Sequence, residues 1–160
     1  MMLKFVKKAH LHLFLLCFVV PLLIDRLTKY FIVHGIWKSH SVTSVLNIYF
    51  TYNRGIAWGI GSNLDHEYVM LTTVVVASVL FYFAWYLRLV ADDHKMLGSC
   101  LLILSGGVSN FFDRIWFGGV IDFIQFHWAN WFFPVFNIAD VCITVGALLL
   151  SYFFLCDYTS

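Results

Sequence analysis

Apolar residues are gathered into four long stretches of this chain, at 13–33, 68–87, 96–113 and 136–156. A helix needs about 20 apolar residues to cross the hydrocarbon core of a bilayer, and each stretch comes close to that length. The stretch at 68–87 carries no charged residue, and Asp140 is the only charge in the last stretch. The pattern therefore predicts four transmembrane helices, and their even number places both termini on the same side of the membrane.

The first two connections between these helices differ in length and character. The first, at 34–67, is long, and its residues 42–52 are rich in β-branched and aromatic side chains, which favour strands lying on the membrane surface. The second, at 88–95, is a short polar turn. The length of the chain allows one domain, so we expect a single integral membrane domain over 1–160.

The third connection, at 113–135, combines a turn signal with a strand-like segment. Gly118 and Gly119 mark the turn, and the apolar stretch 120–128 follows them. The aromatic residues that suit a membrane interface in this region are Trp128, Trp131, Phe132 and Phe133. The expected fold is an all-α membrane protein, with four transmembrane helices and a small extracytoplasmic platform that contains β-strands.

The composition agrees with a protein that is built in lipid. Of the 160 residues, 61% are hydrophobic and 12% are charged, and the mean hydropathy is +0.83. Soluble domains carry about 25% charged residues, roughly twice this fraction. The net charge is +1, and no basic patch with interleaved aromatic residues is present, which argues against nucleic-acid binding.

The cysteines and histidines give no sign of a metal centre or of a disulfide framework. Cys17, Cys100, Cys142 and Cys156 all fall in apolar stretches without a CxxC pair, so we interpret them as small buried hydrophobic residues. The histidines form neither an HExxH motif nor a cluster with cysteine at ligand spacing. We therefore expect no metal site.

The N-terminal region is similar to a secretory signal peptide but lacks its cleavage site. The basic residues Lys4, Lys7 and Lys8 precede the apolar segment 11–24, and the polar run 25–29 follows where small residues would be needed. We interpret this region as a retained first transmembrane helix. Lys and Arg divide evenly between the two sides of the membrane, but several on the far side lie beside candidate site residues. Discounting those residues places both termini in the cytoplasm.

Two of the aspartates within or beside the apolar stretches have charged or polar neighbours. Asp25 shares a helix face with Lys29, four residues later, so the two side chains can pair. A structural ion pair and a contact with substrate both remain open for Asp25. Asp113 has Arg114 beside it and Asn110 three residues earlier, which favours a structural polar cluster.

Asp122 and Asp140 differ because neither has a cation nearby in the sequence. Asp140 falls in the first turn of the last predicted helix, where the helix dipole favours a carboxylate, and Asn137 lies three residues before it. Asp122 lies just beyond the end of the third helix. Both acids are therefore expected at the same membrane face.

Two carboxylates that meet in an apolar site cannot both ionise easily, so such a pair shares a proton. The ionised member takes a proton from water, and the protonated member donates to the carbonyl oxygen and then to the leaving nitrogen. This arrangement suits hydrolysis of an amide. Serine chemistry has weaker support, because no histidine lies near Ser105 or Ser109.

Two other classes of protein are compatible with buried aspartates. A small transporter or channel subunit would use them as an ion path, spread through the depth of the membrane on facing helices. A structural subunit would use them only to pack helices. The acids gather at one face instead, and the helix at 68–87 has none, which favours the hydrolase.

Five sequence blocks stand out, at 25–29 (DRLTK), 53–59 (NRGIAWG), 106–114 (GGVSNFFDR), 120–123 (VIDF) and 133–140 (FPVFNIAD). Together they resemble the signal peptidase II family, the bacterial lipoprotein signal peptidases that act as intramembrane aspartic proteases. The resemblance implies that Asp122 and Asp140 form the catalytic dyad, the pair that the residues themselves favour. The residues that it implies to shape the site or to contact substrate are Asp25, Lys29, Asn53, Arg54, Gly55, Asn110, Asp113, Arg114 and Asn137.

The resemblance also implies the substrate and the cellular setting. The substrate is a prolipoprotein that carries a diacylglyceryl group on its lipobox cysteine, and cleavage occurs just before that cysteine. The reaction takes place at the outer face of the bacterial cytoplasmic (inner) membrane, among membrane lipids, without a cofactor, and the cyclic peptide globomycin is expected to inhibit it. Trp58, Ser109 and Val141 stand where the family commonly has Phe, Gly and Ser.

Overall fold

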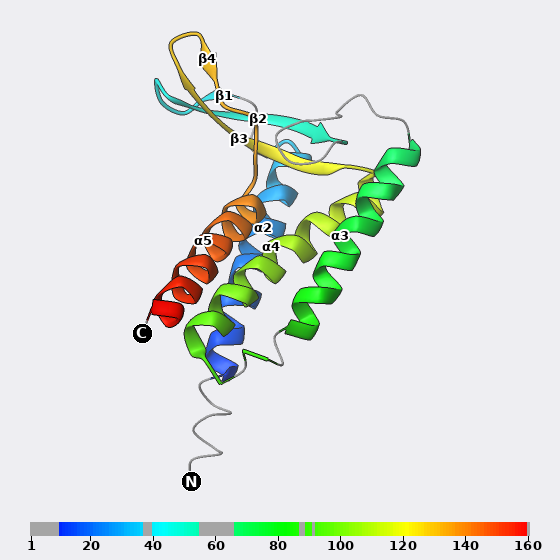
Figure 1. Ribbon diagram of the computed structural model, residues 1–160. Helices are drawn as coiled ribbons and strands as arrows, with labels where there is room; N and C mark the ends of the chain where they lie inside the picture. Colours follow the sequence, from blue (N-terminus) through cyan, green and yellow to red (C-terminus); the bar gives the residue numbers. More distant parts are fainter. Residues whose placement is uncertain (1–9, 37–39, 55–65, 87–88, 91, 160) are drawn as a thin grey trace. The chain divides into compact units, whose positions relative to one another are not determined.

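The computed structural model describes residues 10–36, 40–54, 66–86, 89–90 and 92–159. The elements follow the chain in the order η1 (Leu15–Val19, a π-helical segment), α2 (Val20–Val33), β1 (His40–Ser41), β2 (Leu46–Asn53), α3 (His66–Tyr86), α4 (His94–Phe117), β3 (Val120–Trp128), β4 (Trp131–Phe132) and α5 (Ile138–Thr159) (Figure 1). Long helices and a small antiparallel sheet confirm the predicted fold class.

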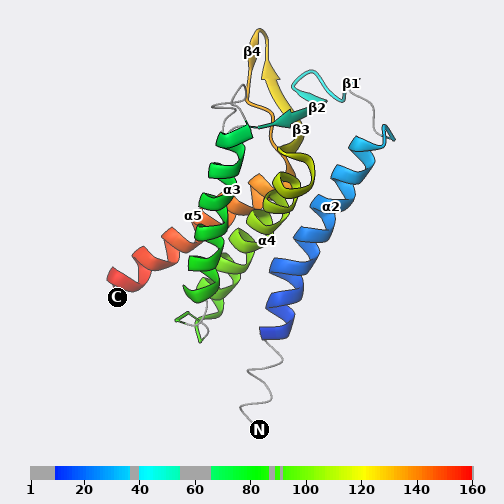
Figure 2. The ribbon, with the colours of Figure 1, turned by 90° about the vertical axis from the view of Figure 1, so that its right-hand side faces the viewer.

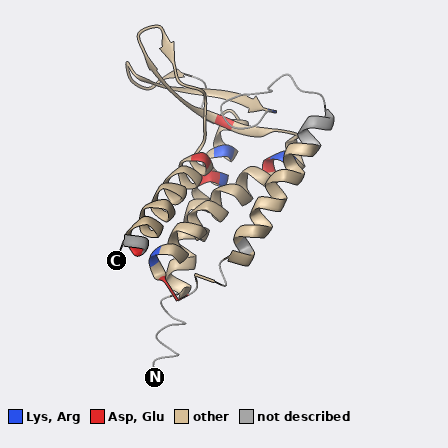
Figure 3. Ribbon diagram, viewed as in Figure 1, with Lys and Arg blue, Asp and Glu red and all other residues tan. Residues whose placement is uncertain are grey.

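Within the part of the chain that the structure describes, three helical segments are long and apolar enough to cross a membrane, namely His10–Val33, His94–Phe117 and Ile138–Asp157. The helix α3 has a shorter apolar run over its described residues, Leu71–Phe83. Figure 3 shows long lengths of helical ribbon without a charged residue. Three of the predicted spans therefore have the length and composition expected, while the span at 68–87 stays a prediction.

The chain divides into two compact units. The first contains Met1–Ile24, Ser78–Val108 and Ile138–Ser160, and the second contains Asp25–Ala77 and Ser109–Asn137. The expectation of a single domain over 1–160 stays a prediction.

Small residues allow α4 and α5 to approach closely in the first unit. A Cβ atom at Gly106 of α4 would collide with the backbone carbonyl oxygen of Ala139. A Cβ atom at Gly146 of α5 would lie 2.8 Å from the carbonyl oxygen of Ser99. Helices in membranes associate through such close backbone packing, because lipid offers no hydrophobic drive to bring them together.

The cysteines only partly follow their predicted burial. Cys100 of α4 is buried, Cys17 and Cys142 are partly buried, and Cys156 near the end of α5 is exposed. The prediction that all four are buried is therefore wrong for Cys156. An apolar side chain at the surface of a membrane helix faces lipid rather than water, so apolar character does not require burial there.

The sheet lies in the second unit, with strand order β1-β2-β3-β4 and antiparallel pairing throughout (Figure 1). Strand β3 matches the predicted 120–128, and β2 overlaps the predicted 42–52. Asn53 of β2 pairs with Val120 of β3, and Thr51 pairs with Asp122, with an irregularity in register between Ile48 and Thr51. The beginning of β3 is buried, including Ile121 and Phe123.

The two glycines between α4 and β3 make the predicted turn. Helix α4 continues to Phe117, four residues beyond the predicted end at 113, and Gly118 ends it with a left-handed φ of 66°. The Gly118 N–H donates to the Arg114 carbonyl at 3.1 Å, as is common where glycine terminates a helix. Gly119 passes so close to β2 that a Cβ atom would lie 3.1 Å from the Asn53 carbonyl oxygen. The turn thereby brings the start of β3 to the end of β2.

The hairpin between β3 and β4 presents aromatic side chains. Its turn contains Ala129 with a φ of 51°, an unusual value for a residue other than glycine. Trp128 and Trp131 beside the turn are 74% and 61% exposed, and Phe132 is also exposed. These three exposed rings are among the four that the sequence predicts at a membrane interface. The fourth, Phe133, is less exposed, because its side chain is half-buried.

Candidate active site

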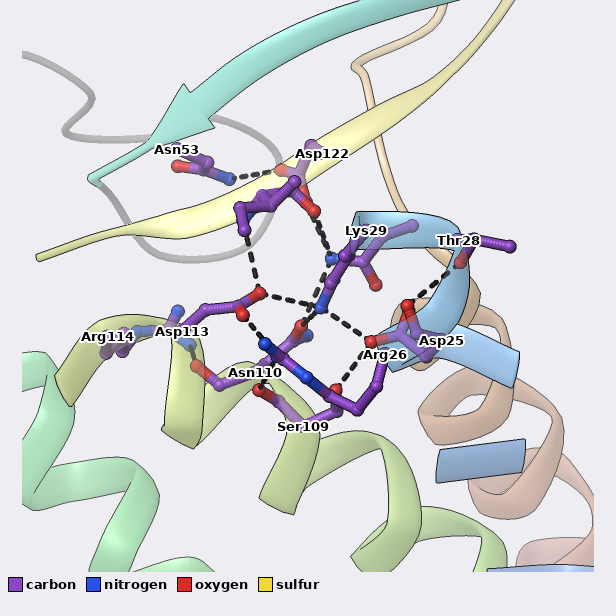
Figure 4. A network of polar contacts seen from close by, with 12 residues as sticks. Asp25, Arg26, Thr28, Lys29, Asn53, Ser109, Asn110, Asp113, Arg114 and Asp122 are labelled. Carbon is purple, nitrogen blue, oxygen red and sulfur yellow. Dashed lines mark hydrogen bonds and ion pairs between the residues drawn. The ribbon is translucent and has the colours of Figure 1, made fainter. Parts of the chain in front are cut away.

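The Asp122 carboxylate belongs to a buried polar network in the second unit (Figure 4). The Asn53 Nδ2 donates to Asp122 Oδ2 at 3.1 Å, and the Asn137 Nδ2 donates to Asp122 Oδ1 at 2.7 Å. Each carboxylate oxygen therefore accepts a hydrogen bond from a different amide, and the side chain is held from two sides. The antiparallel register of β2 and β3 pairs Asn53 with Val120, two residues from Asp122, so the Asn53 and Asp122 side chains lie on the same face of the sheet, diagonal to each other.

Asn137 lies immediately before α5 and is fully buried. Its Nδ2 lies 3.1 Å from Asn110 Oδ1 and 3.2 Å from the Ile121 carbonyl oxygen, in addition to its bond with Asp122. The amide thus joins the end of α4, the strand β3 and the segment before α5.

Lys29 of α2 is also fully buried, and three oxygen atoms surround its ammonium group. Its Nζ lies 2.7 Å from Asp25 Oδ2, 2.7 Å from Asp113 Oδ2 and 2.9 Å from Asn110 Oδ1. The C-terminal half of α2 accordingly lies beside that of α4 within this unit (Figure 2). The pair of Asp25 and Lys29, predicted from their spacing, is confirmed.

The Asp113 carboxylate pairs with two cations of α2 and accepts a backbone N–H of β3. Its Oδ1 forms an ion pair with Arg26, and its Oδ2 pairs with Lys29 and accepts the Ile121 N–H at 3.3 Å. The Asp113 side chain is fully buried, and the Arg26 side chain is 31% exposed. Asp25, Arg26, Lys29 and Asp113 together form a set of two acids and two bases, which keeps these charges balanced inside apolar surroundings.

Ser109 adds a hydroxyl group to this set. Its Oγ donates to Asp25 Oδ2 at 2.5 Å, and its side chain is fully buried. The Arg26 guanidinium donates to the Ser109 backbone carbonyl at 3.4 Å. Ser109 therefore contacts both of the neighbouring charged residues of α2.

The structure brings most of the predicted site residues together. Those joined by the contacts above are Asp25, Lys29, Asn53, Asn110, Asp113, Asp122 and Asn137. Arg114 donates from Nη1 to the Asn110 carbonyl at 3.2 Å, and Arg54 is exposed at the end of β2. Asp140 lies in the first turn of α5, as predicted, and belongs to the first unit. Gly55 lies outside the described residues.

Sequence reasoning missed Arg26 and Ser109 as members of the network. Arg26 was visible as a charged residue inside an apolar stretch, a position at which a buried partner is expected. Ser109 was visible only as a departure from the pattern expected for its sequence block. The neighbour of Asp113 in sequence, Arg114, suggested a local cluster, whereas Asp113 forms its ion pairs with Arg26 and Lys29 of another helix.

Over the described ranges, no three His, Cys, Asp or Glu side chains gather in a way that could hold a metal ion. The expected absence of a metal stays a prediction.

The fold and the network define a class, namely a mostly helical membrane protein with a buried carboxylate held by amides beside a neutral set of ion pairs. The family described as Signal peptidase (SPase) II matches residues 17–156. The chain therefore belongs to the signal peptidase II family, and it is a peptidase.

Curated relatives agree with this family over most of their length. The lipoprotein signal peptidase of Syntrophotalea carbinolica is 34% identical over 155 residues, which cover 91% of this chain and 93% of that protein. The lipoprotein signal peptidase of Burkholderia vietnamiensis is 36% identical over 136 residues, which cover 84% of this chain and 82% of that protein.

Two solved structures share the fold. A bacterial membrane enzyme determined by the in meso method at 2.3 Å resolution has a TM-score of 0.74 and 32% identity, covering 91% of this chain and 88% of its own. A second bacterial membrane enzyme, determined by the same method at 1.9 Å resolution, has a TM-score of 0.70 and 31% identity. The match covers 89% of this chain and 92% of that protein.

Proposed function

We propose that this protein is an aspartic endopeptidase that removes the signal peptide from diacylglyceryl-modified prolipoproteins, cutting just before the lipid-modified cysteine. Asp122 and Asp140 are its catalytic dyad. The observation that carries the proposal is the buried Asp122 carboxylate, which two asparagine amides hold in a protein of this family. The names of the relatives, lipoprotein signal peptidases, support the substrate class.

The covalent chain supports the pairing of the two acids. Asn137 donates to Asp122, and Asp140 follows Asn137 by three residues. Three peptide units span at most about 11 Å between the Cα atoms, so Asp140 is tethered to the residue that holds Asp122. The first turn of α5 also favours a carboxylate at position 140, because the helix N-terminus is partly positive.

The chemistry of such a pair suits hydrolysis of a peptide bond. One carboxylate is ionised and removes a proton from the attacking water, while the other is protonated and donates to the carbonyl oxygen. As the tetrahedral intermediate collapses, the second takes that proton back from the hydroxyl group and delivers it to the leaving nitrogen, so that the C–N bond breaks, the first keeps the proton from water and the pair again holds one proton. Amide donors from Asn53 and Asn137 keep the Asp122 oxygens in place while the proton moves.

The substrate is itself anchored in the membrane, so the enzyme works at the bilayer surface of the cytoplasmic (inner) membrane. We place both termini in the cytoplasm and the dyad near the outer face. The sheet forms a platform that receives the extended peptide, since such a peptide can add to a strand edge. The exposed Arg54 contacts peptide carbonyls or phosphate, and globomycin inhibits the enzyme by occupying the dyad.

The test is cleavage of a diacylglyceryl-modified prolipoprotein by purified protein in detergent, with a chelator present. Wild-type protein is compared with Asp122→Asn and Asp140→Asn. Asp92→Asn is the matched control, because Asp92 is an exposed carboxylate in the turn between α3 and α4. Wild-type and Asp92→Asn should cleave with many turnovers, while both dyad variants remain folded and inactive.

Other outcomes would redirect the assignment. Cleavage by Asp122→Asn or Asp140→Asn at the wild-type rate would exclude that residue from the dyad. Failure of folded wild-type protein to cleave would favour a transport or structural role for the aspartates. Loss of cleavage with chelator alone would point to a metal-dependent reaction.

A further inference from the structure

We propose that Ser109 is a positioning residue for Asp122, and that it acts through the buried ammonium group of Lys29. The inference rests on the proposed function, because it takes Asp122 as a reacting group. Its basis is the direction in which each hydrogen bond of the network must run.

The Lys29 ammonium determines the direction of the first hydrogen bonds of this network, because it can only donate. An ammonium carries three N–H groups and no acceptor. Three oxygens lie within hydrogen-bond distance of Lys29 Nζ, at 2.7 Å from Asp25, 2.7 Å from Asp113 and 2.9 Å from Asn110. Each N–H group therefore has its own acceptor, and Lys29 has one orientation inside a fully buried environment.

The direction of the next two contacts follows from the chemistry of the donors. Because Lys29 can only donate, the Asn110 amide must present its oxygen to it. The same oxygen lies 3.1 Å from the Asn137 amide, which must therefore present its nitrogen. That nitrogen is 2.7 Å from Asp122 Oδ1. Lys29 thus determines which atom of each asparagine faces its neighbour, and the last of these atoms donates to Asp122.

A second arm of the network holds the main chain before Asp122. Asp113 Oδ2, which pairs with Lys29, also accepts the Ile121 N–H at 3.3 Å. The Ile121 carbonyl accepts from Asn137 at 3.2 Å. Both polar backbone atoms of the residue before Asp122 are therefore tied to the network, so its side chain and its main chain depend on the same ammonium group.

Ser109 fixes the remaining counterion of Lys29. Its Oγ lies 2.5 Å from Asp25 Oδ2, which is also the oxygen that contacts the ammonium. An ionised carboxylate only accepts, so the hydroxyl donates and holds the Asp25 carboxylate in one rotamer. Without that hydroxyl, Asp25 Oδ2 keeps its contact with the Lys29 ammonium but loses a donor that orients it, so the position of this counterion is less narrowly defined.

The experiment compares Ser109→Ala with Ser105→Ala. Ser105 lies one turn earlier on α4, is also buried, and donates from Oγ to the Phe18 carbonyl at 2.9 Å. Both variants delete one buried hydroxyl and one hydrogen bond, but only Ser109 contacts the network. We expect Ser109→Ala to lower kcat for the lipidated precursor about tenfold with KM within about twofold, because small misplacement of a reacting group is costly. Ser105→Ala should keep both constants within about twofold of the wild-type values.

A second readout does not depend on activity. Protein labelled with 15N-asparagine in detergent micelles reports the side-chain amides of Asn110 and Asn137 by NMR. Ser109→Ala should shift both signals, and Ser105→Ala should leave them in place. The signals are assigned with Asn110→Asp and Asn137→Asp.

Two results would overturn the proposal. Wild-type kcat and unshifted amide signals in Ser109→Ala would show that the hydroxyl positions nothing. Equal losses of kcat in the two serine variants would show a general effect of packing. If wild-type protein fails to cleave the precursor, the proposed function fails, and the amide signals still decide whether Ser109 orders the network.

Discussion

Lys29 Nζ and Asp113 Oδ2 lie 2.7 Å apart, and both side chains are fully buried. Placing an ion in such surroundings costs several kcal/mol, and its partner offsets this cost only when the geometry is good and the remaining hydrogen bonds are made. Asp25 and Arg26 complete the set, so that two acids face two bases. The network is consequently sensitive to the loss of any one charge.

Removing Arg26 tests this sensitivity. Arg26→Gln leaves the buried Asp113 with one cation fewer, and we expect a loss of about 1–3 kcal/mol in the free energy of unfolding. This is less than for a fully buried pair, because the Arg26 side chain is 31% exposed. Arg54→Gln removes an exposed cation and should change stability by no more than about 0.5 kcal/mol. Thermal unfolding in detergent compares the two, and equal midpoints would contradict the prediction.

Variants of the two asparagines of β2 distinguish a role in holding Asp122 from a role in strand pairing. Asn53→Ala removes one of the amides that hold Asp122, so we expect kcat to fall about tenfold or more. Asn47→Ala, on the same strand, removes a contact with Gln125 at 3.3 Å and should leave kcat close to the wild-type value. Steady-state cleavage of the lipidated precursor measures both. Similar losses in the two variants would mean that the sheet as a whole, rather than the Asn53 amide, supports the reaction.

Two glycines of α4 are expected to respond differently to an added methyl group. A Cβ atom at Gly106 meets the Ala139 carbonyl oxygen and lies 2.8 Å from Ile143 Cγ1, so Gly106→Ala should cost about 1–3 kcal/mol of stability. It should also reduce activity, because Ala139 precedes Asp140. At Gly98 the nearest atom to a Cβ is Leu13 Cδ2 at 3.6 Å, an ordinary contact. Gly98→Ala should therefore be tolerated in both assays, and an equal loss at Gly98 would refute the packing argument.

The turn of the β3–β4 hairpin offers a stabilising substitution. Ala129 has a φ of 51°, which a residue with a Cβ atom adopts at a cost of about 1–2 kcal/mol. Ala129→Gly removes this cost, and we expect a gain of roughly 1 kcal/mol, measured as slower hydrogen exchange across the hairpin. Asn130→Gly, at the neighbouring turn position, should give no gain, because glycine there only increases the freedom of the unfolded chain. Faster exchange in Ala129→Gly would count against the strain.

Elements that depend on local pattern could be predicted from the sequence. The apolar stretches predicted the helices, the segment 120–128 predicted β3, and the spacing of Asp25 and Lys29 predicted their ion pair. These features follow from the periodicity of helix and strand, which each segment carries by itself. The choice of Asp122 as a special acid also came from a local feature, the lack of nearby cations in the sequence.

The links between segments could not be predicted in the same way. Nothing local shows that Arg26 faces Asp113, or that Asn110 joins Lys29 to Asn137. Such contacts depend on the rotation of α2 and α4 about their axes, which the packing of the folded protein determines. Strand β4 was missed because its two residues are too short to show a period. Ser109 illustrates the same limit, since a buried serine in a membrane helix most often serves packing.

The four-residue spacing of Asp25 and Lys29 also bears on how the protein is made. The first helix is synthesised and enters the bilayer before the segment that contains Asp113 exists. A lone lysine in an inserting segment carries an unfavourable transfer free energy of about 2.5–3.5 kcal/mol at the helix centre. Because Asp25 lies on the same helix face, Lys29 already has its counterion within the first helix when this segment inserts into the membrane. The inserted helix therefore carries a single unbalanced charge, that of Arg26, until Asp113 is synthesised and pairs with it.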